Sequence, residues 1–138
     1  MAMLVSIIVP CYNEEAALPY FLQEIKKTEA EMHAAYGCCF ELIFINDGSK
    51  DKTLSVLRDF ANNDPSVRYL SFSRNFGKEA AMYAGLKHAS GSYVALMDAD
   101  LQHPPHIVKD MLVKWEEGYD DVYAKRKSRD GETFLKKF

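Results

Sequence analysis

Short apolar segments alternate along the chain with stretches of helical periodicity, and this alternation constrains the fold more than any other feature. The apolar segments span residues 4–9, 40–45, 67–72, 92–97 and 121–124. The first, second and fourth are nearly continuous in Ile, Val, Leu, Phe and Met, which is typical of strands covered on both faces in a parallel sheet. Because strand–helix alternation implies right-handed crossovers, the sequence predicts an α/β fold with a doubly wound, mostly parallel sheet.

Helices are expected between these strands. In the first, near residues 18–25, the apolar side chains share one face and Pro19 falls in the first turn, where proline is tolerated. The second follows Ser49, its predicted N-cap. The third is expected at about residues 76–88, and the fourth from Pro104 or Pro105 to Gly118.

Composition limits the class of protein. A chain of 138 residues with 48% hydrophobic residues suits a single domain over residues 1–138. Its apolar runs are shorter than the roughly 20 residues of a membrane helix. Its three cysteines suggest no disulfide framework, so a cytoplasmic location is expected. The net charge of −3 argues against a nucleic-acid partner, although the last fourteen residues carry a net charge of +4 and residues 127–138 form a basic tail.

Polar side chains follow every predicted strand. Because the carboxyl ends of parallel strands meet at one edge of a sheet, these side chains should lie together where ligands bind. Acids and bases interleaved there suit a phosphate ligand that carries a divalent metal. The set comprises Asn13, Glu14, Asp47, Arg74, Asn75, Lys78, Asp98, Asp100 and Arg126.

Simpler explanations exist for single members of this set. Asp98 and Asp100 could form an acidic loop that caps the following helix, and residues 46–49 form a good turn by themselves. Lys78 could simply be solvated. Cys11 has no histidine nearby in sequence, which favours a small buried residue over a nucleophile.

Other ligand-binding motifs are absent from the sequence. The segment "PCYNEE" stands where a dinucleotide-binding G-x-G-x-x-G would follow the first strand. The segment "RNFGKEAA" lacks the earlier glycine and the hydroxyl residue of a P-loop. His103 and His106 lack the further Cys or His ligands of a zinc site.

Four ordered motifs together resemble a known family. They are "VSIIVPCYNEEAALP", "ELIFINDGSKDKT", "SFSRNFGKEAAMYAGLKHASGSYVALMDADLQHPP" and "AKR". In order and spacing the chain resembles family 2 glycosyltransferases of the GT-A fold. It is most similar to the polyprenyl-phosphate glycosyltransferases, that is, bacterial undecaprenyl-phosphate (bactoprenol) glucosyltransferases and dolichol-phosphate mannosyltransferases, and "RNFGKEAA" with "DADLQHPP" favours the bactoprenol branch.

The resemblance implies a role for individual residues. Asp98 and Asp100 would form the D-x-D pair, with Asp100 as the direct ligand of Mg²⁺ or Mn²⁺ and Asp98 contacting either the ribose or the metal. Asp47 would meet the base, close to Lys78. The implied nucleotide-binding set is Pro10, Tyr12, Glu14, Asp47, Lys78, Asp98 and Arg126. A UDP-sugar is the expected donor, with a GDP-sugar as the alternative, and a polyprenyl phosphate is the expected acceptor.

The family pattern extends beyond what this sequence contains. Members carry a "G-D-F-R-L"-like segment with a catalytic Asp near the acceptor, followed by amphipathic and transmembrane helices. The resemblance therefore implies that the catalytic Asp lies beyond Phe138, and no catalytic residue is assigned within the sequence.

We accordingly expect the nucleotide-binding half of a longer protein at the cytoplasmic face of a membrane. This half should bind donor without transferring sugar, and it could form a homo-oligomer. The alternatives left open are a receiver-like metal-binding regulatory module and an inactive nucleotide-binding domain.

Overall fold

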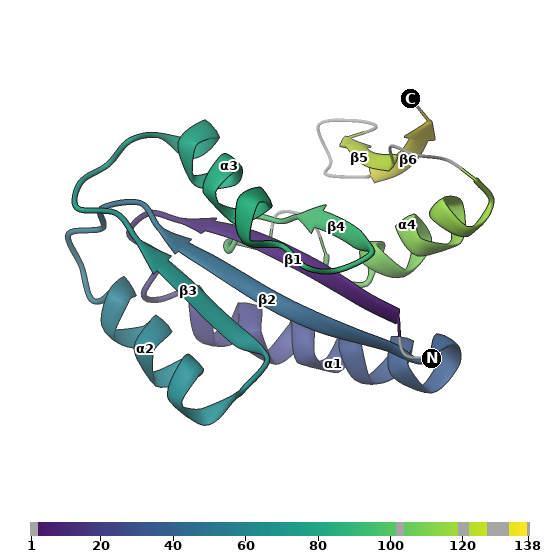
Figure 1. Cartoon of the computed structure of the whole chain (residues 1–138), viewed down its shortest axis with the longest axis horizontal. Helices are drawn as coiled ribbons and strands as arrows, with labels where there is room; N and C mark the ends of the chain where they lie inside the picture. Colours follow the sequence, from purple (N-terminus) through teal and green to yellow (C-terminus); the bar gives the residue numbers. More distant parts are fainter. Residues whose placement is uncertain (1–2, 102–103, 119–121, 127–132, 138) are drawn as a thin grey trace.

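A four-stranded parallel sheet forms the centre of the molecule (Figure 1). The computed structural model describes residues 3–101, 104–118, 122–126 and 133–137. The sheet has the order β3-β2-β1-β4 and consists of β1 (Met3–Cys11), β2 (Cys38–Asn46), β3 (Val67–Ser71) and β4 (Tyr93–Leu96). All of its pairings are parallel, so the predicted α/β class is confirmed.

Helices cover both faces of this sheet. They are α1 (Leu18–Tyr36), α2 (Thr53–Asn63), α3 (Lys78–His88) and α4 (Ile107–Glu116). The odd-numbered side chains of β1, such as Ile7, pack in one core with residues of α1, α2 and α4. Ile8 faces the other way and packs with Ala81 of α3. Gly85 lets α3 approach closely, because a Cβ there would lie 2.4 Å from Cγ2 of Ile8.

The chain end contributes a separate hairpin. β5 (Val122–Arg126) pairs antiparallel with β6 (Thr133–Lys137) in a two-stranded sheet. The predicted fifth strand is therefore present, but in the described part of the chain it does not join the parallel sheet. β6 lies within the basic tail and was not predicted, because a strand of five residues is defined by its partner more than by its own sequence.

Two predicted helix starts are wrong. Ser49 does not cap α2, which begins at Thr53, where Oδ1 of Asp51 accepts hydrogen bonds from the backbone N–H (2.9 Å) and the hydroxyl (2.5 Å) of Thr53. Pro104 and Pro105 precede α4 in a turn, and their carbonyl oxygens accept from the N–H groups of the first helical residues. The observed starts of α2 and α4 differ from the predicted ones because a helix start depends on which groups accept from its free N–H groups. Sequence spacing alone does not specify those groups.

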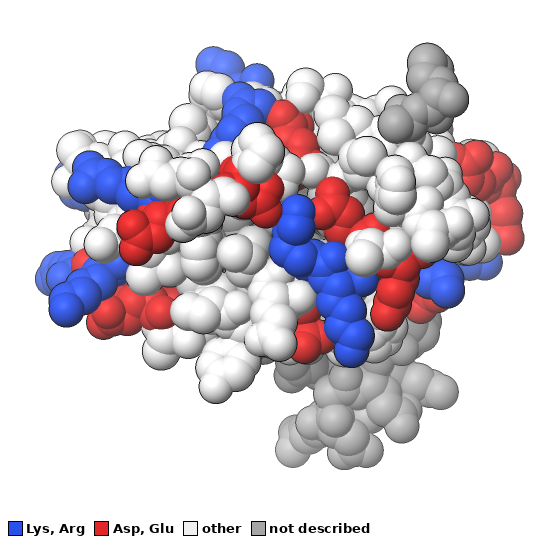
Figure 2. All heavy atoms as spheres, turned by 90° about the horizontal axis from the view of Figure 1, so that it is seen from below, with Lys and Arg blue, Asp and Glu red and all other residues white. Residues whose placement is uncertain are grey.

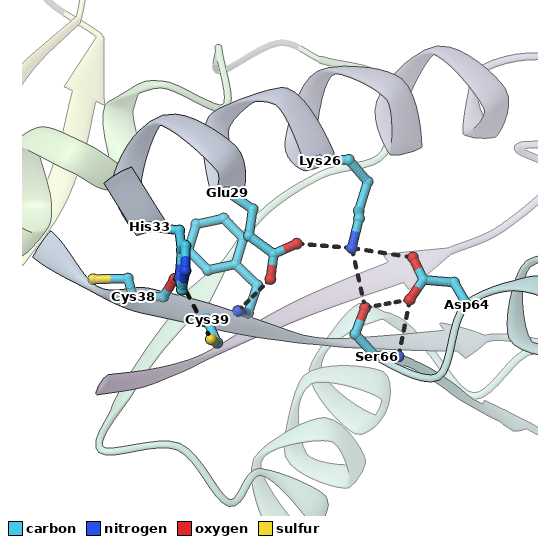
Figure 3. Close-up of polar contacts among 8 residues, drawn as sticks. Lys26, Glu29, His33, Cys38, Cys39, Asp64 and Ser66 are labelled. Atoms are coloured by element: carbon cyan, nitrogen blue, oxygen red, sulfur yellow. Dashed lines mark hydrogen bonds and ion pairs between the residues drawn. The ribbon is translucent and has the colours of Figure 1, made fainter. Parts of the chain in front are cut away.

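The charged surface and the cysteines complete the description of the fold. On the face of the molecule shown in Figure 2, basic and acidic side chains lie interspersed among the described residues. Within the described residues, no helix is long and apolar enough to cross a membrane. Cys11, Cys38 and Cys39 are free thiols, and the Sγ of Cys39 lies 3.8 Å from Nδ1 of His33 (Figure 3).

A buried carboxylate braces the amino-terminal half of the sheet. Glu41 of β2 accepts hydrogen bonds from Oγ of Ser6 (2.6 Å), from the N–H (3.0 Å) and Oγ (2.8 Å) of Ser90, and from the guanidinium of Arg68. Burial alone would raise the pKa of this carboxyl, but the hydrogen bonds outweigh burial and lower the pKa. Glu41 thus ties β1, β2, β3 and the α3–β4 loop together.

A second brace joins α1 to the start of β3 (Figure 3). Nζ of Lys26 lies 2.7 Å from Oε1 of Glu29 and 3.1 Å from Oδ2 of Asp64. The other oxygen of Glu29 accepts from the N–H of Phe40 (2.7 Å), and Oδ1 of Asp64 accepts from the N–H of Ser66 (2.9 Å). The ammonium therefore links acids that also hold the backbone.

Candidate functional site

A hollow of about 260 Å³ opens at the carboxyl ends of the central strands. It is bordered by every residue of the predicted nucleotide-binding set whose side chain the structure describes. The described lining comprises Pro10, Cys11, Tyr12, Glu14, Asp47, Asn75, Gly77, Lys78 and Asp98. The parallel order of the strands places these residues together, because β1 lies between β2 and β4 and all three end at the same edge.

The loops after β1 and β2 hold each other in place. Asn13, in a left-handed conformation with φ 54°, donates its N–H to Oγ of Ser49 (2.9 Å) and accepts at Oδ1 from the N–H of Lys50 (2.8 Å). The N–H of Glu14 donates to Oγ1 of Thr53 (2.9 Å). Asn13 therefore supports the rim structurally, and Glu14 is fixed at the edge of the hollow.

Asp47 is buried at the wall of the hollow, with only 4% of its surface exposed. Its Oδ1 accepts from the N–H of Phe76 (2.7 Å) and its Oδ2 from the N–H of Gly77 (3.1 Å). A carboxylate oxygen has two lone pairs, so each oxygen keeps acceptor capacity toward the hollow. Arg74, another predicted rim residue, stacks its guanidinium 4.3 Å from the ring centroid of Phe76.

Several carboxylates lie near Glu14 at the hollow. Burial raises the pKa of Glu14, and the negative charges of Asp100, Asp98 and Asp51 raise it further. Acids that disfavour one another's ionisation are stabilised by a cation. One cation is already present, since Nζ of Lys78 lies 2.8 Å from Oδ1 of Asp98.

A smaller hollow of about 210 Å³ adjoins the first. It shares Pro10, Lys78 and Asp98 with the larger hollow, and its remaining wall consists of Met82, Leu96 and Met97. The Lys78–Asp98 ion pair therefore borders both hollows.

The remaining predicted site residues differ in position. Asp100 is exposed and does not border either hollow, although its charge reaches Glu14. Arg126 ends β5, and its side chain lies outside the described residues, as does His103. Burial and the charge of Glu14 raise the pKa of Cys11, so this thiol is a poor nucleophile, as the sequence indicated.

The predicted catalytic Asp has no counterpart among the residues that line the two hollows. It is expected beyond Phe138, the last residue of the sequence, and Phe138 itself lies outside the described residues. The position of the catalytic group therefore stays a prediction that concerns the whole protein.

The carboxylate oxygens at this site are suitable ligands for a hard divalent cation. Carboxylate oxygens are the ligands that Mg²⁺ and Mn²⁺ prefer, and Mg²⁺ is commonly held by one or two carboxylates together with substrate phosphates. Within the described ranges, no three or more His, Cys, Asp or Glu side chains form a ready-made metal site. Asp98 and Asp100 would therefore share such an ion with the phosphates of a ligand.

Gly77 is a member of the lining that sequence reasoning missed. Its φ of 102° lies outside the range that other residues readily adopt, and its N–H contacts Asp47. Gly77 falls inside the third predicted helix, at about residues 76–88, whereas in the structure it is the N-cap of α3. The signal was available, since glycine is among the residues favoured at an N-cap.

Comparisons with known proteins agree with the motifs. The model of the family described as glycosyl transferase family 2 matches residues 6–138. An uncharacterized glycosyltransferase, YkcC of Bacillus subtilis, is 46% identical over 132 residues, which cover 96% of this chain and 40% of that protein. A bactoprenol glucosyl transferase of Shigella phage SfV is 46% identical over 135 residues, covering 98% of this chain and 43% of that protein. The chain thus spans about two fifths of the length of these relatives.

Solved structures show the same architecture. Staphylococcus aureus TarS 1-349 in complex with UDP superposes with a TM-score of 0.67 at 27% identity, covering 87% of this chain and 34% of TarS 1-349. The mannosyltransferase PcManGT from Pyrobaculum calidifontis, in complex with GDP-Man and Mn²⁺, gives a TM-score of 0.68 at 27% identity and covers 92% of this chain and 36% of PcManGT. Both neighbours are GT-A glycosyltransferases, which confirms the predicted fold.

Proposed function

The chain belongs to glycosyl transferase family 2, and on this premise we propose that it binds the nucleotide diphosphate of a UDP-sugar together with Mg²⁺ or Mn²⁺. The observation that carries the proposal is the hollow at the carboxyl ends of β1, β2 and β4, where the predicted nucleotide-binding residues come together beside a cluster of acids. The UDP and GDP-mannose complexes of the structural neighbours support a nucleotide ligand but leave the base open.

Each part of the hollow has a distinct task. Pro10, Tyr12 and Asp47 border the hollow, and in this proposal they contact the base and the ribose. Asp98 and Asp100 would hold the divalent ion, and Arg126 would reach toward the diphosphate. The chemistry that such an ion would supply is neutralisation of charge on the nucleotide diphosphate as it leaves. Lys78 brings a second positive charge to the hollow, and its present partner, Asp98, would share it with the ligand.

The similarity to bactoprenol glucosyl transferases suggests the acceptor. We propose a polyprenyl phosphate, whose phosphate oxygen attacks the anomeric carbon as the nucleotide diphosphate leaves. Such an acceptor implies a membrane-associated protein that acts in envelope glycan synthesis. The acceptor, the membrane association and any homo-oligomer are proposals about a whole protein of this family. The chain itself aligns with only part of the length of its relatives.

Calorimetry tests the donor site. UDP, GDP and their sugar conjugates are titrated into the protein with Mn²⁺ and with EDTA. We expect UDP and UDP-sugars to bind in Mn²⁺ and to lose about ten-fold or more in affinity in EDTA, because metal and phosphate are bound together. Tight binding of GDP but not UDP would correct the base, and metal-independent binding would contradict the role of the acids.

Asp100→Asn is the corresponding variant. It removes one charged metal ligand and should weaken UDP by about ten-fold or more in Mn²⁺ but little in EDTA. Asp59→Asn is the matched control, since Asp59 is an exposed acid on α2 outside both hollows. If Asp100→Asn bound UDP as tightly as the parent in Mn²⁺, the proposed metal site would be wrong.

A further inference from the structure

The loop between β1 and α1, residues 12–17, contains no helix or strand and is held by side chains of another segment. Three consecutive N–H groups in this loop donate to side-chain oxygens of the segment that follows β2. The pairs are Asn13 with Oγ of Ser49 (2.9 Å), Glu14 with Oγ1 of Thr53 (2.9 Å) and Glu15 with Oδ2 of Asp51 (3.2 Å). The position of the loop therefore depends on residues 49–53.

Thr53 differs from the other two acceptors in its burial. It has no exposed surface, whereas the contacts of Ser49 and Asp51 with the loop are exposed. Water can replace a lost acceptor at an exposed N–H, but it does so poorly where the acceptor is buried. The contact with Thr53 is thus the one whose loss the loop can least compensate.

Asp51 fixes the direction of the Thr53 hydroxyl. Its Oδ1 accepts from this hydroxyl (2.5 Å) and from the N–H of Thr53 (2.9 Å). Burial alone would raise the pKa of Asp51, but its hydrogen bonds, above all those from Thr53, outweigh burial and lower the pKa. Because an ionised carboxylate only accepts, the hydroxyl proton points to Asp51 and the lone pairs of Oγ1 are left for the N–H of Glu14.

The backbone of Glu14 is held on both sides. Its N–H donates to Thr53, and its carbonyl oxygen accepts from the N–H groups of Ala17 (3.1 Å) and Leu18 (3.0 Å), where α1 begins. Glu14 borders the larger hollow, as does Tyr12 two residues earlier. A displacement of the backbone at Glu14 would therefore disturb the part of the loop that lines the hollow.

We propose that Thr53 is a positioning residue, whose hydroxyl fixes residues 12–17 and so supports nucleotide binding without touching the ligand. Thr53 and Asp51 border neither of the two hollows. The inference rests on the proposed function and deepens it, because Tyr12 and Glu14 belong to the proposed nucleotide-binding set. It adds a residue from the first turn of α2 to the support of that set.

Two substitutions of Thr53 test this proposal. The affinity for UDP in Mn²⁺ is measured by calorimetry for the parent, Thr53→Val and Thr53→Ser. Valine keeps the branched shape without the hydroxyl, and serine keeps the hydroxyl without the methyl group. Neither changes the charge near the metal and the phosphates. We expect Thr53→Val to weaken UDP about ten-fold and Thr53→Ser to weaken it less than about three-fold.

Two controls separate positioning from general loss of stability. Thr28→Val makes the same chemical change at a buried threonine of α1 that borders neither hollow. Glu41→Gln removes a stabilising acid from the other end of the sheet, where it contacts Ser6 and Ser90. Both variants should change UDP affinity by less than about two-fold, because neither site contacts residues 12–17.

Amide hydrogen exchange of Glu14, measured without ligand, gives a readout that does not involve binding. Thr53→Val should speed exchange at this amide, and Thr53→Ser should not. Asp51→Asn should also speed it, because asparagine no longer fixes the direction of the hydroxyl. Since Asp51 is only partly buried, this variant provides the exchange measurement even if Thr53→Val does not fold.

The outcomes that would overturn the proposal are distinct. One is parent-like UDP affinity of Thr53→Val, and another is an equal loss in Thr53→Ser, which would show that the hydroxyl is not responsible. An equal loss in either control would assign the effect to general stability. Unchanged exchange at Glu14 in Thr53→Val or Asp51→Asn would remove the physical link. Failure of the parent to bind any nucleotide would instead refute the proposed function, on which this inference rests.

Discussion

Two carboxylates at opposite ends of the same sheet, Glu41 and Glu14, lie in contrasting surroundings. In the amino-terminal half, Glu41 is surrounded by donors, and its pKa is lowered despite burial. At the carboxyl end, Glu14 lies among other acids, and burial together with their charges raises its pKa. An acid surrounded by hydrogen-bond donors stabilises the fold, whereas acids placed near one another are stabilised by a bound cation. Among the described residues, Lys78 supplies part of that positive charge through its ion pair with Asp98.

Lysines show the same contrast. Lys26 bridges two acids that also hold the backbone, with 38% of its side chain exposed (Figure 3). Lys78 contacts a single acid at the edge of the hollow and is 61% exposed. The first ion pair is part of the framework, and the second is open to exchange with a ligand. Four predictions test this distinction, from the largest expected effect to the smallest.

Glu41→Gln should cause the largest loss of stability. Removing the charge of a buried, hydrogen-bonded acid leaves Arg68 without its counter-charge and should lower the free energy of unfolding by about 3 kcal/mol. Urea denaturation monitored by circular dichroism measures the change. Glu24→Gln, an exposed acid on α1, is the control and should cost less than about 0.5 kcal/mol. If Glu41→Gln and Glu24→Gln lowered the free energy of unfolding by similar amounts, the proposed role of Glu41 as a stabilising acid would be wrong.

Acidification should remove the stabilisation that Glu41 and Asp64 provide. The folded pKa values of Glu41 and Asp64 lie below their unfolded values, so both groups stabilise the fold at pH above the unfolded values near 4. That contribution disappears as the pH falls through the folded pKa values. The parent should therefore lose more unfolding free energy than Glu41→Gln between about pH 6 and 3 in urea titrations. Parallel pH profiles of parent and variant would contradict this prediction.

Identical substitutions of the two lysines should have unequal effects. Lys26→Met removes an ammonium shared by Glu29 and Asp64 and should lower the unfolding free energy by about 1 kcal/mol. Lys78→Met breaks one exposed pair and should cost only a few tenths of a kcal/mol. Thermal melts of both variants provide the measurement. A larger loss for Lys78→Met would mean that its ion pair belongs to the framework.

Glu14→Gln should have the smallest effect and the opposite sign. Because the folded pKa of Glu14 is raised, its charge opposes folding at any pH above the folded pKa, and this penalty disappears below the unfolded value. Neutralising it should increase the unfolding free energy at pH 7 by a few tenths of a kcal/mol and have no effect near pH 3. Differential scanning calorimetry at the two pH values would detect it. A stability loss at pH 7 would show that Glu14 has a structural partner.

Much of this arrangement could be predicted from local sequence. The apolar segments correctly located the strands of the parallel sheet, and the polar segments after them supplied the lining of the hollow, including Tyr12, Glu14 and Lys78. Glu41 and Arg68 were missed. A charged residue inside an apolar strand could have indicated them, since a buried charge needs a partner. The serine partners of Glu41 are too distant in sequence to be recognised without the fold.

The sequence by itself determined the alternation of strands and helices, the polar strand ends and the family motifs, because periodicity and spacing are local properties of the chain. Only the tertiary structure decided that β1 lies between β2 and β4, which places Asp47 and Asp98 at the same hollow. It also decided that Asp47 holds Phe76 and Gly77 while Asp98 pairs with Lys78. The physical reason is that a carboxylate binds whichever donors or cations the packed chain brings within about 3 Å, and sequence spacing does not specify those neighbours.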